Sequence, residues 1–201
     1  MLIWGHSILV KFSLTFVRSR VGLATLTAME ITALDQESTA YPQRLLTISS
    51  PPKELFIRGA DLNALLTRPC VAIVGSRRIT PYGRQVTYNL ARDLAEQGVV
   101  IISGLAIGVD SEAHRAALSV GGLTIAVLPR SVSNIYPATN RQLAQQIIES
   151  SGALVSEYEY GDFAYKSNFV ARNRIVTGLA NVLVITEATE KSGSLIQRLS
   201  P

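Results

Sequence analysis

The sequence predicts an α/β protein with a Rossmann-like, doubly wound, mostly parallel sheet and helices on both of its faces. Five short apolar segments recur along the chain, separated by amphipathic segments of helical length. Four of the five apolar segments end in small or polar residues. Continuous rather than alternating apolar strands are typical of parallel sheets, because helices bury both faces of such a sheet.

The apolar segments are the expected strands, at residues 70–74, 99–102, 123–128, 153–155 and 182–185. Helices are expected between them, at residues 81–97, 109–120, 142–149 and 169–179. Thr80 is a suitable cap for the first helix, and Pro81 suits its first position because no hydrogen bond is lost there. Val86, Leu90 and Leu94 recur every four residues and should form its buried face.

The segments before the first parallel strand are less regular. Residues 1–34 are expected to be a poorly ordered extension, with a targeting or membrane role as the alternative, and residues 35–201 to be one domain. Within that domain, residues 35–60 contain many turn-forming residues and read as a strap with a short edge strand at 55–58. Asp61 should cap a short helix that reaches Leu66.

Composition excludes several classes of site. The net charge is +4, but residues 1–28 contribute three of the basic residues and no acid, so overall basicity does not argue for nucleic acid. The single Cys70 cannot form an intrachain disulfide, and one Cys with two His cannot build a zinc site. No G-x-G-x-x-G fingerprint follows a strand, so we expect no NAD or FAD and no other cofactor. Lys11, Arg18 and Arg20 interrupt the only long apolar stretch, and a cytoplasmic protein is expected.

The strand ends suggest an anion site. Ligands of doubly wound sheets bind outside the carboxyl ends of the strands. Gly75 and Ser76 at one end, and Ser103 with Gly104 at the next, could bring backbone N–H groups close to a phosphate. Arg77 would add a bidentate phosphate partner. A plain turn is the competing interpretation of each glycine.

Asp110 and His114 are four residues apart on an expected helix and could form a proton-transfer pair. The alternative is structural: Asp110 would cap or charge the helix start, and His114 would hydrogen-bond a neighbouring loop. No serine or cysteine nucleophile stands at a recognisable position nearby, so we expect no catalytic residue.

Aromatic and basic residues alternate before the last strand. The aromatic residues surround Lys166, and a cluster of Arg172, Asn173 and Arg174 follows; the aromatic residues are Tyr158, Tyr160, Phe163, Tyr165 and Phe169. Rings can stack on bases while cations follow phosphates, which suits single-stranded nucleic acid. Burial of the rings in the core is the alternative.

Together these motifs resemble the DNA-processing protein A family, also called DprA or Smf, in its Rossmann-like domain. The resemblance rests on VAIVGSRRITPYG (71–83), SGLAIGVDSEAHRAAL (103–118), GGLTIAVLP (121–129), FVARNRIVTGLA (169–180) and EATEKSGSLI (187–196). It implies a non-enzymatic protein that binds and protects single-stranded DNA and helps to load the RecA recombinase in natural transformation.

By the same resemblance, Gly75, Ser76, Arg77, Ser103 and Gly104 contact phosphates. Lys166 adds a charged contact, Phe169 stacks on a base, and the cluster at 172–174 lines the pocket. Arg172 and Arg174 cannot both face it, so one of them could pair with Glu157 or Glu187.

The family continues beyond residue 196, so the domain is expected to be short at its C-terminus. Contacts for a homodimer and for RecA are in doubt for that reason. The alternative function is a nucleotide-binding enzyme related to the lysine-decarboxylase-like (LOG) phosphoribohydrolases. Its expected PGGxGTxxE turn is replaced here by EKSGSL, at residues 190–195.

Overall fold

One seven-stranded sheet, in the order β1-β2-β6-β5-β4-β3-β7, organises the computed structural model, which describes residues 30–159 and 165–188. The five expected strands pair in parallel, while β1 and β2 are antiparallel additions at one edge. The bounds are β1 Ile31–Asp35, β2 Glu54–Gly59, β3 Cys70–Gly75, β4 Val100–Ser103, β5 Thr124–Leu128, β6 Ala153–Ser156 and β7 Val182–Glu187. The expected fold class is confirmed.

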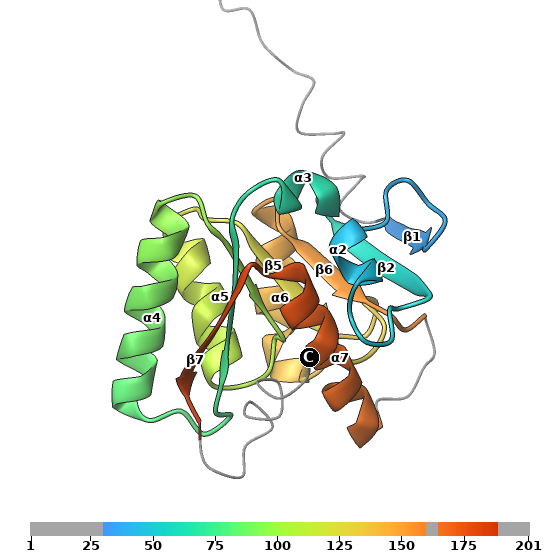
Figure 1. Cartoon of the computed structure of the whole chain (residues 1–201). Coiled ribbons are helices and arrows are strands. Elements are labelled where there is room, and N and C mark those ends of the chain that lie inside the picture. Colours follow the sequence, from blue (N-terminus) through green and yellow to red (C-terminus); the bar gives the residue numbers. More distant parts are fainter. Residues whose placement is uncertain (1–29, 160–164, 189–201) are drawn as a thin grey trace, which may run out of the picture.

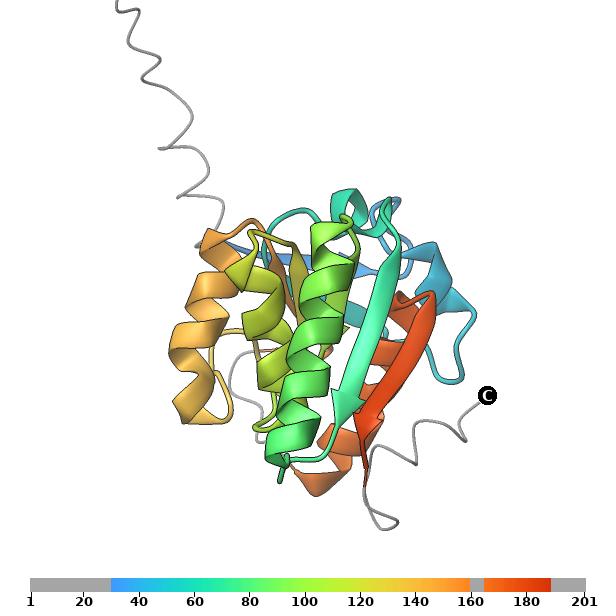
Figure 2. The ribbon, with the colours of Figure 1, turned by 90° about the vertical axis from the view of Figure 1, so that its left-hand side faces the viewer.

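Helices cover both faces of this sheet. Figure 2 shows α4, α5 and α6 on one face, and Figure 1 shows α7 on the other, with α2 and α3 at its margin. The helices are α2 Gln43–Leu46, α3 Leu62–Leu66, α4 Pro81–Glu96, α5 Val109–Ser119, α6 Arg141–Glu149 and α7 Lys166–Leu179, with a 3-10 turn at Ala138–Asn140.

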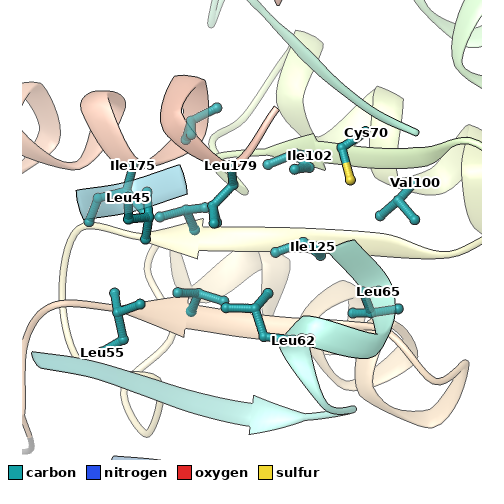
Figure 3. Close-up of a cluster of buried hydrophobic side chains, with 14 of the residues drawn as sticks. Leu45, Leu55, Leu62, Leu65, Cys70, Val100, Ile102, Ile125, Ile175 and Leu179 are labelled. Carbon is teal, nitrogen blue, oxygen red and sulfur yellow. The ribbon is translucent and has the colours of Figure 1, made fainter. Parts of the chain in front are cut away.

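Successive strand residues alternate between the two faces, as strand geometry requires. In β4, Ile102 belongs to the core under α7, whereas Ile101 belongs to the core under α4 and α5. Figure 3 shows the first of these cores, in which Ile102 and Ile125 meet Ile175 and Leu179 of α7. The same layer contains Cys70, a buried free thiol. The continuous apolar strands are therefore buried on both sides.

The N-terminal edge differs from the expectation. Residues 31–34, expected to belong to the N-terminal extension, form most of β1, which pairs with β2 over its whole length, from Ile31 opposite Arg58 to Asp35 opposite Glu54. The strand expected at residues 55–58 is therefore not an edge strand: β2 lies between β1 and β6. Residues 1–29 lie outside the described part of the chain.

Helix α4 has the expected start but a different buried face. The hydroxyl of Thr80 accepts a hydrogen bond from the Gly83 N–H at 3.0 Å, and Pro81 is the first helical residue. The buried residues are small, namely Gly83, Thr87, Ala91 and Ala95, whereas Val86, Leu90 and Leu94 are only half-buried. Small side chains allow the helix to pack closely, and the larger apolar residues flank this contact. The expected buried face was wrong by one residue.

The carboxyl ends of the parallel strands form one rim of the sheet, at the lower side of Figure 2, where the arrowheads of β3 and β7 lie. Helices α4 and α7 begin at the same rim (Figure 1). In the part of the chain that the structure describes, no helix has the length and apolarity needed to cross a membrane.

Candidate nucleic-acid interface

A hollow opens at this rim. The loops after β3, β4 and β5 line it together with the first half of α7; the lining residues are Arg77, Gly104, Ala106, Ile107, Pro129, Tyr136, Pro137, Phe169 and Arg172. Gly104, Pro129 and Arg172 are buried, and we call them the floor of the hollow. The expected position outside the strand ends is where the hollow is found.

Three side chains meet at the mouth of the hollow. The guanidinium carbon of Arg77 lies 5.1 Å from the centroid of the Phe169 ring, within the distance of a cation–π contact. Tyr136 meets the same ring edge-on, with 5.6 Å between centroids. Arg77 and Tyr136 are exposed, and Phe169 is half-buried. The sequence placed Arg77 and Phe169 in one site but gave Tyr136 no role there, because its loop position offered no periodic signal.

Lys166 shares helix α7 with Phe169, because this helix begins earlier than expected. The helix starts at Lys166 rather than at residue 169, so Lys166 is its first residue and not part of the preceding loop. Residues three apart on a helix share a face. The exposed ammonium group of Lys166 therefore rises from the same side of α7 as Phe169. Tyr160 and Phe163 lie outside the described residues.

The contacts of Arg172 and Arg174 show which of the two arginines faces the hollow and which pairs with a carboxylate. Arg174 forms a two-pronged ion pair with Glu157, at 2.8 Å (Nη1–Oε1) and 2.5 Å (Nη2–Oε2), and its Nε donates to the carbonyl of Ser50. Hydrogen bonding to Glu157 raises the pKa of Arg174. Asn173 accepts a hydrogen bond from Arg172 Nε at 3.3 Å. Arg174 is therefore held away from the hollow, and Arg172 is the arginine that lines it.

Arg172 is buried, with only 4% of its surface exposed. Its Nη1 donates to the carbonyl of Gly104 at 2.6 Å and to that of Val127, which joins α7 to the ends of β4 and β5. Burial lowers the pKa of Arg172 to about 10, with the carboxyl group of Asp110 opposing the change. The guanidinium group thus stays charged at neutral pH.

The glycines at the strand ends allow close packing inside the fold. A Cβ atom on Gly104 would collide with the guanidinium group of Arg172, and one on Gly75 would lie 2.6 Å from the Glu187 carbonyl and 2.7 Å from Val109 Cγ2. The Gly104 N–H already donates to Asp110 Oδ2 at 3.1 Å. Internal packing therefore requires glycine at both positions, and close approach of a ligand there stays a prediction.

Serines at the same ends also have internal partners. The hydroxyl of Ser103 is fully buried and donates to the Ile73 carbonyl at 2.6 Å. The Ser76 N–H donates to the Glu187 carbonyl at 2.7 Å, and the Ser76 hydroxyl accepts from the Arg78 N–H at 3.0 Å. These bonds fix the shape of the loop that carries Arg77.

A carboxylate of the protein itself occupies the start of α4. Glu187, at the end of β7, accepts hydrogen bonds from the Thr80 N–H and from the Thr80 hydroxyl, the latter at 2.6 Å. Helix starts favour negative charge, and here an internal group supplies it. A phosphate near Gly75 would therefore rely on the Arg77 side chain rather than on the helix N-terminus.

Asp110 and His114 do not form a hydrogen-bonded pair. Asp110 accepts from the backbone N–H groups of Gly104 and Ala106, and burial raises its pKa. The Thr124 hydroxyl donates to the Ile101 carbonyl, so it accepts from Nδ1 of His114 at 2.7 Å. Burial lowers the pKa of His114 to about 3, with nearby cations adding to the effect, and the ring is neutral. The structural interpretation fits Asp110, which holds the loop before α5, while His114 bonds to strand β5 rather than to a loop.

Metal binding has no support in this part of the protein: residues 30–159 and 165–188 contain no group of three or more His, Cys, Asp or Glu that could hold an ion.

The family model described as DNA recombination-mediator protein A matches residues 32–199. The chain belongs to this family. The expected resemblance to DprA and Smf proteins is confirmed.

Individual relatives and solved structures are similar to the chain over most of its length. Protein Smf of Synechocystis sp. is 41% identical over 165 residues, which are 81% of this chain and 41% of that protein. The structure of DprA from Streptococcus pneumoniae superposes with a TM-score of 0.77 at 36% identity, over 87% of this chain and 60% of that one. A DprA structure from Helicobacter pylori, described for its single-stranded DNA binding mode, gives a TM-score of 0.75 at 40% identity, over 84% of this chain and 74% of that one. The chain therefore spans about two fifths of the length of the Smf relative.

Proposed function

We propose that this chain binds single-stranded DNA at the rim hollow and acts as a recombination mediator without catalysing a reaction. The observation that carries the proposal is the contact of Arg77 with Phe169, 5.1 Å from its centroid, at the mouth of a hollow that also contains Tyr136. Single-strand binding requires a cation for the phosphate beside a ring for the base, and stacking on that ring is worth about 1–3 kcal/mol per base.

The proposed path of the strand follows from exposure. Arg77 and Lys166 are exposed and would follow the phosphates, while Phe169, flanked by Tyr136, would receive a base. The residues with internal hydrogen bonds or close internal packing would support this surface from below; they are Gly75, Ser76, Ser103, Gly104, Asn173 and Arg174. Arg172 would complete the floor.

Family membership supports the same function. The family is described as a recombination mediator, and the H. pylori relative is described as binding single-stranded DNA. Protection of incoming DNA, loading of RecA, homodimer formation and a cytoplasmic location are proposed with it, by resemblance to proteins longer than this chain.

The test is a titration of labelled single-stranded and double-stranded oligonucleotides at several salt concentrations. Each phosphate contact to a single strand contributes about 0.7 to the slope of log K against log salt. Arg77→Ala and Lys166→Ala should therefore each weaken binding and flatten the slope by about that amount. Arg92→Ala is the matched control, since Arg92 is late in α4 and hydrogen-bonds Asp93.

The proposal predicts tighter binding of single strands than of duplexes. Equal affinity for the two forms, or a loss in Arg92→Ala as large as in Arg77→Ala, would contradict it.

A further inference from the structure

Arg172 has a donor that the fold does not use. Its Nη1 serves the carbonyls of Gly104 and Val127, and its Nε serves Asn173. Nη2 makes no hydrogen bond with any residue that the structure describes. The side chain is 96% buried and yet lines the hollow (4% exposed).

The guanidinium group of Arg172 lines the hollow, and its free Nη2 donor makes the floor complementary to a hydrogen-bond acceptor. A guanidinium group has donors only, which excludes an amino group as its partner. The surrounding lining is largely apolar and flat, including Pro129, Tyr136 and Pro137.

The acceptor should be neutral rather than a phosphate. Asp110 accepts hydrogen bonds from two backbone N–H groups beside the floor and lies near enough to Arg172 for each to influence the pKa of the other, so acceptor oxygens already accompany the guanidinium. An anion at the floor would face this carboxyl group and lose its hydration against apolar walls. A carbonyl oxygen on a flat ring has neither disadvantage.

We propose that Nη2 of Arg172 reads the base in the hollow by donating to an exocyclic carbonyl oxygen. This inference rests on the proposed function. The substituent at position 4 of a pyrimidine or position 6 of a purine lies away from the sugar, so it reaches deepest when a base enters from a strand held outside. Thymine and guanine present a carbonyl oxygen there, whereas cytosine and adenine present an amino donor. The hollow therefore prefers keto bases.

The first test uses the unaltered protein and homopolymers of deoxyuridine and deoxycytidine of equal length. These pyrimidines differ where the proposed contact is made, and uracil avoids the methyl group of thymine. The expected result is roughly tenfold tighter binding of deoxyuridine, the lower part of the range for reading a base edge. An oligomer of 2-pyrimidinone, which lacks the substituent, should bind with intermediate affinity.

Two failures are distinguishable. If neither homopolymer binds, the proposed function itself fails. If both bind with equal affinity at the same salt concentration, the function stands and the keto preference is refuted.

A second test assigns the preference to Arg172. Arg172→Met should reduce the ratio of deoxyuridine to deoxycytidine affinity to about one, while Arg172→Lys, which keeps a donor, should retain part of it. Because Nη1 also joins two strand ends, folding of each variant is checked by circular dichroism. Arginine side-chain ¹⁵N–¹H spectra of the unaltered protein avoid that dependence: deoxyuridine, but not deoxycytidine, should shift the Arg172 signals. A keto preference without such a shift would overturn the assignment.

Discussion

Replacement of Phe169 by alanine removes the platform on which the proposed binding mode depends. Loss of one base stack should cost about 1–3 kcal/mol, which corresponds to roughly 5- to 150-fold weaker binding. Arg77 would also lose its partner ring, 5.1 Å away, and with it up to about 1 kcal/mol of ordering at an exposed site. No charge is removed, so the salt dependence should stay unchanged.

Fluorescence anisotropy with a labelled single strand measures both quantities in one experiment. Phe169→Trp should retain affinity because it keeps an aromatic face, and Val170→Ala is the matched control on the same helix, since Val170 is 54% exposed and does not line the hollow. Affinity of Phe169→Ala within twofold of the unaltered protein would refute stacking on this ring. A changed salt slope would show instead that Phe169 acts by placing Arg77 and Lys166.

The other predictions concern the structure that supports the hollow. Arg174→Gln should lower the free energy of unfolding by about 1–3 kcal/mol in urea titrations, because Glu157 keeps a half-buried charge without its partner; a flattened salt slope for DNA would instead place Arg174 in the interface. Gly104→Ala should weaken binding and stability together, because its methyl group collides with Arg172; an unchanged melting temperature would contradict this packing. His114 has a pKa of about 3 when folded against 6.5 as a free side chain, so protonation of the unfolded chain should reduce stability as pH falls from 6.5 toward 3, by up to about 1.4 kcal/mol per pH unit. His114→Gln should lack this share of the slope, and equal slopes in the two proteins would refute it.

Sequence patterns predicted the architecture well where one physical cause dominated. Burial on both faces makes a parallel strand continuously apolar, so all five parallel strands were found within one or two residues of their observed ends. The same argument predicted the position of the site, because the loops after parallel strands must meet at one rim. The antiparallel strand β1 was missed: its residues are mostly exposed, and its sequence ITALD contains no continuous apolar run.

Patterns failed where a residue type has two uses. Glycine at a strand end suits a ligand or a close internal contact, and the close contact of Gly104 with Arg172 is visible only in the fold. Arginine pairs with phosphates or with carboxylates by the same geometry. Helical spacing predicted that Arg172 and Arg174 point in different directions. Which of them lines the hollow depends on the ion pair of Arg174 with Glu157, and Glu157 is brought next to α7 only by the folded sheet.

The two arginines show how one helix can divide structural and recognition roles. The guanidinium group of Arg174 donates to Glu157 and to the backbone carbonyls of Ser50 and Ala171, so few of its donors remain for DNA. Arg172 is more deeply buried, and yet its contacts use Nη1 and Nε alone. The contacts that hold Arg172 in place also fix the direction of Nη2, so a base would meet a donor that loses little side-chain entropy on binding. Selectivity for one base would then arise from the same bonds that hold β4, β5 and α7 together, and a variant that loosens those bonds should lose base preference before it loses overall affinity for the strand.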